Sequence, residues 1–192
     1  MTQPNKGKLQ LILLLAIFIL PVLVVLGLYW TNWNPSGGKS HGVLIKPPQE
    51  ITVSAMQDVS GKWFRPADWR DRWHLVKVSS GACAEQCIQD LHDMRQLHAS
   101  LAQDIDRLQR VWVTTADVPT ADLLKIRQQY PDLVILAAAD ALEKKLEASG
   151  QAHVRFYLVD PLGKIMMYYP EATEVRDIRT DLIKLFRYSW AG

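Results

Sequence analysis

The strongest pattern in the chain is an apolar run, LILLLAIFILPVLVVLGLYW, which extends from Leu11 to Trp30 and carries no charged side chain. At about 1.5 Å of rise per residue, a helix of this length spans the roughly 30 Å hydrocarbon layer of a bilayer. Lys6 and Lys8 precede the run, and the next charged residue is Lys39. By the positive-inside rule, the pattern predicts one transmembrane helix over 11–30, a cytoplasmic tail over 1–10, and an outward-facing remainder.

A cleavable signal peptide is the alternative interpretation of this run. The apolar part of a signal peptide usually has about 7–15 residues and leads to a small-x-small cleavage site. The present run is longer, and no such site follows Gly27, so an uncleaved anchor is favoured. Residues 31–49 are rich in proline and glycine, and we expect them to form a linker with one short strand at Val43–Ile45.

Beyond the linker, short apolar segments alternate with amphipathic segments. A spacing of three, four or seven residues puts Cys87, Leu91, Met94 and Leu101 on one face of a long helix. The pattern predicts strands at Ile51–Asp58, Trp73–Val78, Arg110–Thr115, Leu133–Ala137, Val154–Val159 and Lys164–Tyr169, a short turn or helix at Arg65–Trp69, and helices at Ala84–Leu108, Thr120–Tyr130, Asp140–Ala148 and Thr173–Trp190.

The order of these elements indicates the fold class. A crossover through the long helix makes the first two main strands parallel, whereas the turn Asp160-Pro-Leu-Gly163 joins the last two strands as an antiparallel pair. An α/β domain over residues 50–192 follows, with a central mixed sheet flanked by helices. This is the order of a thioredoxin-like fold.

Charge and composition remove several classes of function. The chain has 22 Lys and Arg residues against 20 Asp and Glu residues, and the two lysines ahead of the apolar run account for the excess. A neutral domain argues against a nucleic-acid partner, because such binding depends on the neutralisation of phosphates. The chain has two cysteines, which are too few for a disulfide scaffold and which matter, if at all, as one pair.

The two cysteines form Cys83-Ala-Glu-Gln-Cys87, where the strand Trp73–Val78 gives way to the long helix. Backbone N–H groups at a helix N-terminus stabilise an anion, so we expect Cys83 to be the reactive thiolate and Cys87, on the apolar face, to be more buried. The spacing allows both thiols to bind one metal ion, whereas a disulfide requires that Cys83 leave helical geometry. Soft thiolates favour Cu(I) or Zn(II). Buried core cysteines or a purely structural disulfide are the alternatives without function.

A third metal ligand is expected to be one of the five histidines. His98 stands roughly 16 Å along the helix from Cys87, which is too far to share an ion. His153 directly precedes the strand Val154–Val159, and in a thioredoxin-like layout this strand lies beside the start of the cysteine-bearing helix. His153 is therefore the candidate ligand, and a solvated loop residue is the alternative.

Several motifs together carry a family resemblance. They are the lead-in Met56-Gln-Asp-Val-Ser-Gly61, the cysteine motif from Gly81 to Cys87, the segment Val113–Pro119, and His153 ahead of Tyr157–Gly163. With the predicted anchor, they resemble the Sco/SenC family, which consists of membrane-anchored, thioredoxin-fold copper proteins that help to assemble cytochrome c oxidase. The resemblance implies that Cys83, Cys87 and His153 bind copper.

Three departures mark the chain as similar to a divergent member of that family, and one of them is a segment between Cys87 and His153 that is shorter than usual. Ala84 and Ile88 stand where members usually carry proline after each cysteine. His153 also stands one residue closer to its Tyr-Leu pair than the family histidine usually does, which would turn its side chain to the other face of a regular strand unless a bulge intervenes.

The resemblance implies a respiratory assembly factor in the bacterial inner membrane, with a periplasmic domain that binds or delivers copper. Its expected partner is a cytochrome c oxidase subunit or another assembly factor. Two alternatives stay open: a thiol-disulfide oxidoreductase without metal, in which Cys83 attacks and Cys87 resolves, and a non-catalytic scaffold. No phosphate loop, Ser-His-Asp order or paired-carboxylate motif stands out, so we expect no enzymatic activity beyond thiol-disulfide exchange.

Overall fold

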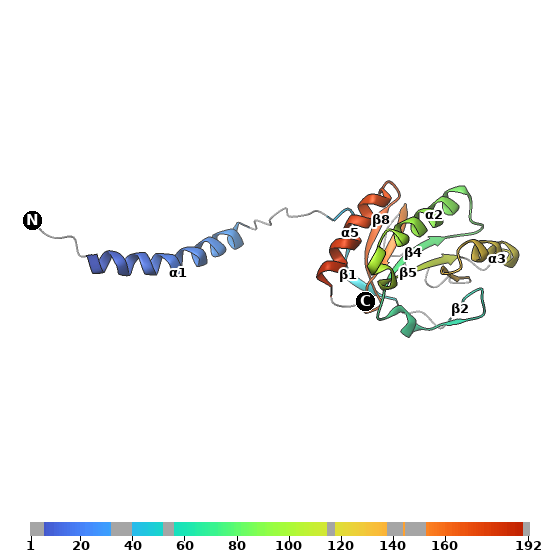
Figure 1. The fold of residues 1–192 in the computed structure, drawn as a ribbon, viewed down its shortest axis with the longest axis horizontal. Helices are drawn as coiled ribbons and strands as arrows, with labels where there is room; N and C mark the ends of the chain where they lie inside the picture. Colours follow the sequence, from blue (N-terminus) through green and yellow to red (C-terminus); the bar gives the residue numbers. More distant parts are fainter. Residues whose placement is uncertain are drawn as a thin grey trace, which may run out of the picture. The chain divides into compact units, whose positions relative to one another are not determined.

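The computed structural model describes residues 6–31, 40–51, 56–114, 118–137, 144 and 153–189. Contacts divide the chain into two units, Met1–Lys39 and Ser40–Gly192. In the first unit, helix α1 (Lys6–Trp30) is exposed along its length (Figure 1). Among the described residues, α1 is the one helix that is long and apolar enough to cross a membrane. The predicted apolar helix is confirmed, and it begins earlier than the apolar run itself.

The second unit is built on a six-stranded mixed sheet. From one edge to the other, its strands are β1 (Val43–Glu50), β8 (Lys164–Pro170), β7 (Val154–Val159), β4 (Trp73–Ser79), β5 (Leu108–Thr114) and β6 (Val134–Leu136). Strands β4, β5 and β6 run parallel, and β7 and β8 form an antiparallel pair. Strand β7 also pairs antiparallel with β4. Both pairings expected from the sequence, the parallel start and the antiparallel hairpin, are confirmed.

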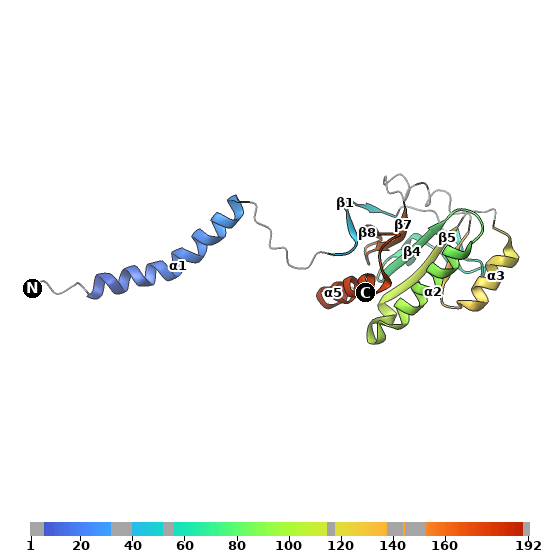
Figure 2. The same cartoon turned by 90° about the horizontal axis from the view of Figure 1, so that it is seen from above.

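Helices α2 (Glu85–Ala99) and α5 (Val175–Tyr188) lie side by side on one face of the sheet (Figures 1 and 2). Alternate strand residues point to opposite faces, so Leu75 and Trp112 join the core under these helices, whereas Val76 and Val111 join the core on the other face. The remaining described elements are α3 (Thr120–Gln129), the 3-10 turns η1 (Pro66–Trp69) and η2 (Ala102–Arg107), and the small hairpin of β2 (Met56–Gln57) and β3 (Trp63–Phe64).

The long helix predicted over Ala84–Leu108 is confirmed as far as Ala99 and is wrong beyond that residue. Helix α2 ends at Ala99, and Ser100 caps it by donating its hydroxyl hydrogen to Leu97 O at 2.7 Å. Ala102 then adopts a positive φ of 52°, which no continuing helix allows. The periodic Leu101 and Leu108 are buried as expected, but through a tight turn and the first position of β5. Burial therefore reproduced an α-helical spacing over residues that form a turn, a 3-10 helix and the start of a strand.

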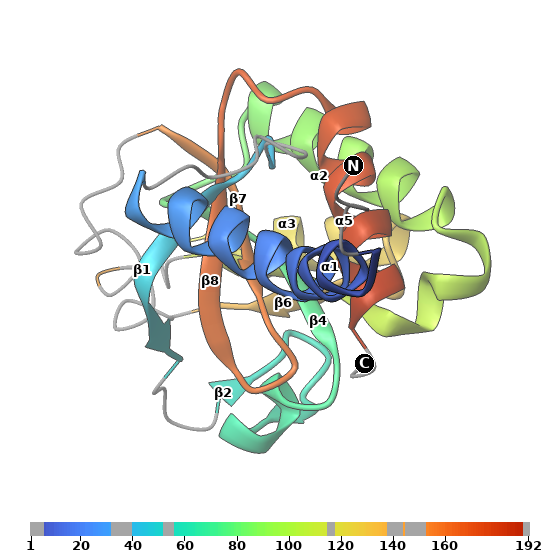
Figure 3. The same cartoon turned by 90° about the vertical axis from the view of Figure 1, so that its left-hand side faces the viewer.

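The domain also begins earlier than its sequence pattern suggests. Strand β1 is longer than the short strand predicted at Val43–Ile45, and it pairs with β8 at the edge of the main sheet (Figure 3). The carboxylate of Asp181 in α5 accepts hydrogen bonds from Ser40 Oγ (2.8 Å) and from the N–H groups of His41 (2.7 Å) and Gly42 (3.0 Å). We call this set of contacts the Asp181 clamp. Residues 40–49, expected in the linker, thus belong to the folded unit.

Two predicted elements of the domain have half or more of their residues outside the described ones. The helix expected at Asp140–Ala148 lies outside them except for residue 144. Of the strand expected at Ile51–Asp58, residues 52–55 lie outside them, and the described part contains β2.

Candidate redox and metal site

Cys83 and Cys87 form a disulfide at the N-terminus of α2. Ala84 has an extended backbone (φ −70°, ψ 176°) and α2 begins at Glu85, so Cys83 lies outside the helix and Cys87 lies in its first turn. This break in helical geometry brings the two Cα atoms to 5.2 Å, within the normal disulfide range. Cys83 is half-buried, whereas Cys87 is 8% exposed. A nucleophile in solution therefore reaches the sulfur of Cys83 more easily.

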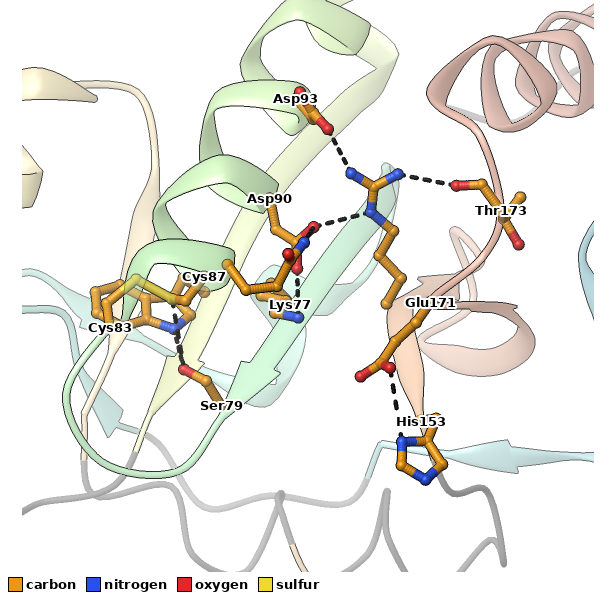
Figure 4. A network of polar contacts seen from close by, with 12 residues as sticks. Lys77, Ser79, Cys83, Cys87, Asp90, Asp93, His153, Glu171 and Thr173 are labelled. Carbon is orange, nitrogen blue, oxygen red and sulfur yellow. Dashed lines mark hydrogen bonds and ion pairs between the residues drawn. A yellow bond between two sulfur atoms is a disulfide. The ribbon is translucent and has the colours of Figure 1, made fainter.

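The last residue of β4 places a hydroxyl group next to the buried sulfur. Ser79 Oγ lies 3.9 Å from Cys87 Sγ (Figure 4). It also lies 2.8 Å from Trp112 Nε1. An indole N–H can only donate, so Ser79 accepts from Trp112. A disulfide sulfur carries no hydrogen, so in the contact with Cys87 the hydroxyl of Ser79 is the donor.

Further along α2, four charged side chains form a largely buried group, which we call the Asp90 network: Lys77, Asp90, Asp93 and Arg155. Asp90 accepts from Lys77 Nζ at 2.7 Å and from Arg155 Nε at 2.8 Å. Arg155 also pairs with Asp93 and donates to Thr173 O at 2.8 Å. Only 2% of the Asp90 side chain is exposed, against 10% for each cation. Because its members come from β4, α2 and β7, the network fixes the cysteine-bearing helix to the sheet (Figure 4).

His153 lies away from the cysteines. It adopts a left-handed φ of 59° just before β7, and its side chain is 82% exposed and pairs with Glu171 at 3.6 Å. In Figure 4, the disulfide and His153 lie on opposite sides of the Lys77–Asp90 pair. The β7–β8 pairing is irregular between Val154 and Phe156, yet the described residues contain no cluster of three His, Cys, Asp or Glu side chains that could hold a metal ion. The structure thus joins the cysteines to each other and leaves His153 apart.

The donor set fits copper in part. Once reduced, the two cysteines would offer soft thiolate ligands, which suit Cu(I). In the disulfide neither sulfur is a thiolate, so reduction must precede metal binding. Within the described part of the chain, no third ligand stands ready beside the pair.

Sequence reasoning missed the polar side chains around the disulfide. Asp90 is a charged residue of the cysteine-bearing helix, yet it is 1% exposed. Its spacing of three from Cys87 and four from Met94 places it on the buried face, and Lys77 within an apolar strand signals a need for a buried partner. Ser79 gave no such signal, because a serine at a strand end is ordinary.

Comparison with known proteins places this geometry in a family. Residues 73–189 match the family described as "Transmembrane-like, thioredoxin-like, C-terminal domain". No curated protein matches the chain.

Solved structures share the fold at low sequence identity. Yeast Sco1 with copper bound is 16% identical, with a TM-score of 0.60 over 74% of this chain and 91% of that one. BsSco, from the Sco family of cytochrome c oxidase assembly proteins, is 20% identical, with a TM-score of 0.57 over 74% and 96%. A thiol:disulfide interchange protein of the thioredoxin family from Chlorobium tepidum is 13% identical, with a TM-score of 0.57 over 71% and 95%.

These likenesses confirm the predicted thioredoxin-like fold, and the Sco structures among them agree with the resemblance drawn from the sequence. The family match begins at the first residue of β4, continues through the cysteine pair and reaches the residue after α5. The chain therefore belongs to the transmembrane-like, thioredoxin-like family.

Proposed function

We propose that this protein is a membrane-anchored assembly factor for a respiratory cytochrome c oxidase, and that its Cys83–Cys87 pair alternates between disulfide and dithiol. The observation that carries the proposal is the unequal exposure of the two sulfurs in a disulfide at a helix N-terminus. The sulfur of Cys83 is accessible to attack, and the sulfur of Cys87 is then the leaving group and stays in its buried position. The disulfide interchange protein among the structural neighbours supports the same chemistry.

The exchange takes place in two balanced steps with a dithiol on a partner protein. A partner thiolate attacks Cys83 Sγ, a mixed disulfide forms, and the Cys83–Cys87 bond breaks with its electron pair on Cys87 Sγ. The second partner thiolate then attacks the partner's own sulfur in the mixed disulfide and releases Cys83 as a thiolate. The partner ends as a disulfide, and this protein ends as a dithiol after taking up two protons.

Copper binding by the reduced pair is the second candidate function. It is favoured by the soft character of two adjacent thiolates and by the copper-bound Sco1 among the structural neighbours. On this proposal, copper is cargo that the dithiol form carries to an oxidase subunit. His153 serves as a third ligand only if the reduced form brings it to the cysteines.

The two chemistries are separated by experiments on the full chain in detergent. Anaerobic titration of the reduced protein should show a single bound Cu(I) ion, which is lost in Cys83→Ser and retained in His98→Ala, whose histidine lies far along α2. Unchanged binding in His153→Ala would show that this histidine is not a ligand. Absence of copper binding by the wild type would remove the copper function and leave disulfide exchange.

The cellular role is tested by complementation of a deletion strain. The wild type should restore oxidase activity, whereas the double variant Cys83→Ser, Cys87→Ser should not. Full activity with the double variant would contradict both chemistries and favour a scaffold that needs neither cysteine.

The proposed topology has the N-terminus in the cytoplasm and the domain in the periplasm. Helix α1 supports a membrane anchor by its length and exposed apolar surface. Added protease should digest the domain in spheroplasts with an intact inner membrane, and a cytoplasmic marker protein should survive. Protection of the domain would reverse the orientation, and release of the protein by alkaline washing would rule out the anchor.

A further inference from the structure

We infer that Ser79, oriented by Trp112, is a positioning residue that stabilises the thiolate which Cys87 becomes when the disulfide opens. The inference rests on the proposed disulfide exchange and adds to it a specific control of the leaving sulfur. Ser79 comes from the end of β4 and Trp112 from the neighbouring strand β5. Both residues thus belong to the sheet and not to the loop that carries Cys83.

The direction of the hydrogen bonds follows from the groups involved. A serine hydroxyl has one hydrogen and two lone pairs, whereas the indole of tryptophan has a donor only. Trp112 is fully buried, and its N–H donates to Ser79 Oγ at 2.8 Å. This bond occupies a lone pair of Ser79, and it leaves the hydroxyl hydrogen to point at Cys87 Sγ, 3.9 Å away.

The contact should strengthen when the disulfide is cleaved. Attack on the more accessible Cys83 makes Cys87 the leaving group, and the electron pair of the broken bond then resides on the sulfur of a residue that is only 8% exposed. A buried anion needs hydrogen-bond donors in place of water. Ser79 provides such a donor before the charge appears, so less rearrangement is required as the thiolate forms.

Loss of this donor should affect reduction more than folding. Ser79→Ala leaves the Trp112 N–H without its acceptor in both the disulfide and the dithiol, so that penalty largely cancels when the two forms are compared. The lost bond to the thiolate affects only the opening reaction. The lower end of the typical strength of a hydrogen bond to a charged group, which suits a contact as long as 3.9 Å, corresponds to about a tenfold change in rate.

The test measures the rate at which dithiothreitol reduces the disulfide in the full chain in detergent, together with the reduction equilibrium. Ser79→Ala should be reduced about tenfold more slowly than the wild type, with its equilibrium shifted toward the disulfide. Ser79→Thr keeps the hydroxyl and should restore most of the rate. Ser80→Ala changes the next, exposed serine and should match the wild type.

A second variant keeps the inference testable if Ser79→Ala does not fold. Trp112→Phe keeps the hydroxyl but removes the N–H that orients it, so reduction should slow by less than in Ser79→Ala. Equal rates for the wild type and a folded Ser79→Ala protein would overturn the inference alone. A wild-type disulfide that resists dithiothreitol in the folded state would overturn the proposed exchange and this inference with it.

Discussion

Replacing Asp90 by asparagine should destabilise the domain strongly, because two buried cations share this one carboxylate. Lys77 Nζ and Arg155 Nε lie 2.7 Å and 2.8 Å from its two oxygens, and the side chain is 2% exposed. Asparagine keeps the shape but removes the charge. Arg155 retains Asp93 and the Thr173 carbonyl, so Lys77 becomes the unpaired ion.

The magnitude follows from the burial of the pair. Breaking a buried ion pair by removing one partner costs about 3–5 kcal/mol, which corresponds to a fall in Tm of about 6–20 °C for a domain of this size. Thermal unfolding of the full chain in detergent, followed by circular dichroism, measures this fall. The double variant Lys77→Met, Asp90→Asn should recover part of it, because the unpaired ammonium is then gone.

Asp122→Asn is the matched control, because it removes the same charge from an exposed pair. Lys125 Nζ lies 3.1 Å from Asp122, and their side chains are 76% and 48% exposed. Such a pair contributes no more than about 1 kcal/mol, or about 2–4 °C in Tm. If Asp90→Asn shifts Tm no more than Asp122→Asn does, the Asp90 network does not stabilise the domain in the way described.

Two further predictions concern other buried groups. Burial lowers the pKa of His74 from 6.5 to about 4, so between these pH values the unfolded chain binds a proton at this histidine and the folded chain does not. The stability from this group is complete above pH 6.5, and the free energy of unfolding should fall by about 3 kcal/mol as the pH drops to 4. Denaturation at several pH values should show that His74→Gln lacks this part of the dependence of stability on pH. A Cβ at Gly42 would lie 2.7 Å from Met167 Cγ and 2.8 Å from Tyr169 Cε1, so Gly42→Ala should lower the free energy of unfolding by roughly 1–3 kcal/mol. Gly7→Ala is the control, because nothing lies within 4 Å of a Cβ at that position. Equal Tm values for the two variants would contradict the prediction and show that the core around Gly42 adjusts freely.

The sequence predicted the sheet well because the strands differ sharply from their surroundings. Strand β7 has the predicted bounds, and β4 differs from prediction by one residue at its end. Apart from His74, Lys77 and Arg155, these segments are apolar and bounded by turn residues, which is the pattern of a strand buried on both faces. Strand β1 was predicted poorly, because Pro47 and Pro48 suppress the strand signal and an edge strand tolerates them.

The sequence predicted only those residues of the site whose residue type by itself indicates a chemical role. A pair of cysteines at a strand-to-helix junction is visible in any sequence, and Cys83 and Cys87 do meet. The partners Ser79 and Trp112 are common residues whose contact depends on the register of β4 against β5. No spacing rule links residues on neighbouring parallel strands, so only the folded sheet reveals them.

With helix α1 as the proposed membrane anchor, the Asp181 clamp sets how far the folded domain can lie from the bilayer. Helix α1 ends at Trp30 and the clamp holds Ser40, so the chain between these residues cannot extend beyond roughly 35 Å at about 3.3–3.6 Å per residue. A linker that continued to Glu50 would allow about twice that reach. Confinement to the shorter radius raises the effective concentration of the domain near the membrane-embedded partners that the proposed function requires. Under the proposed function, a carboxylate of α5 thereby limits which disulfides or copper sites the domain can meet.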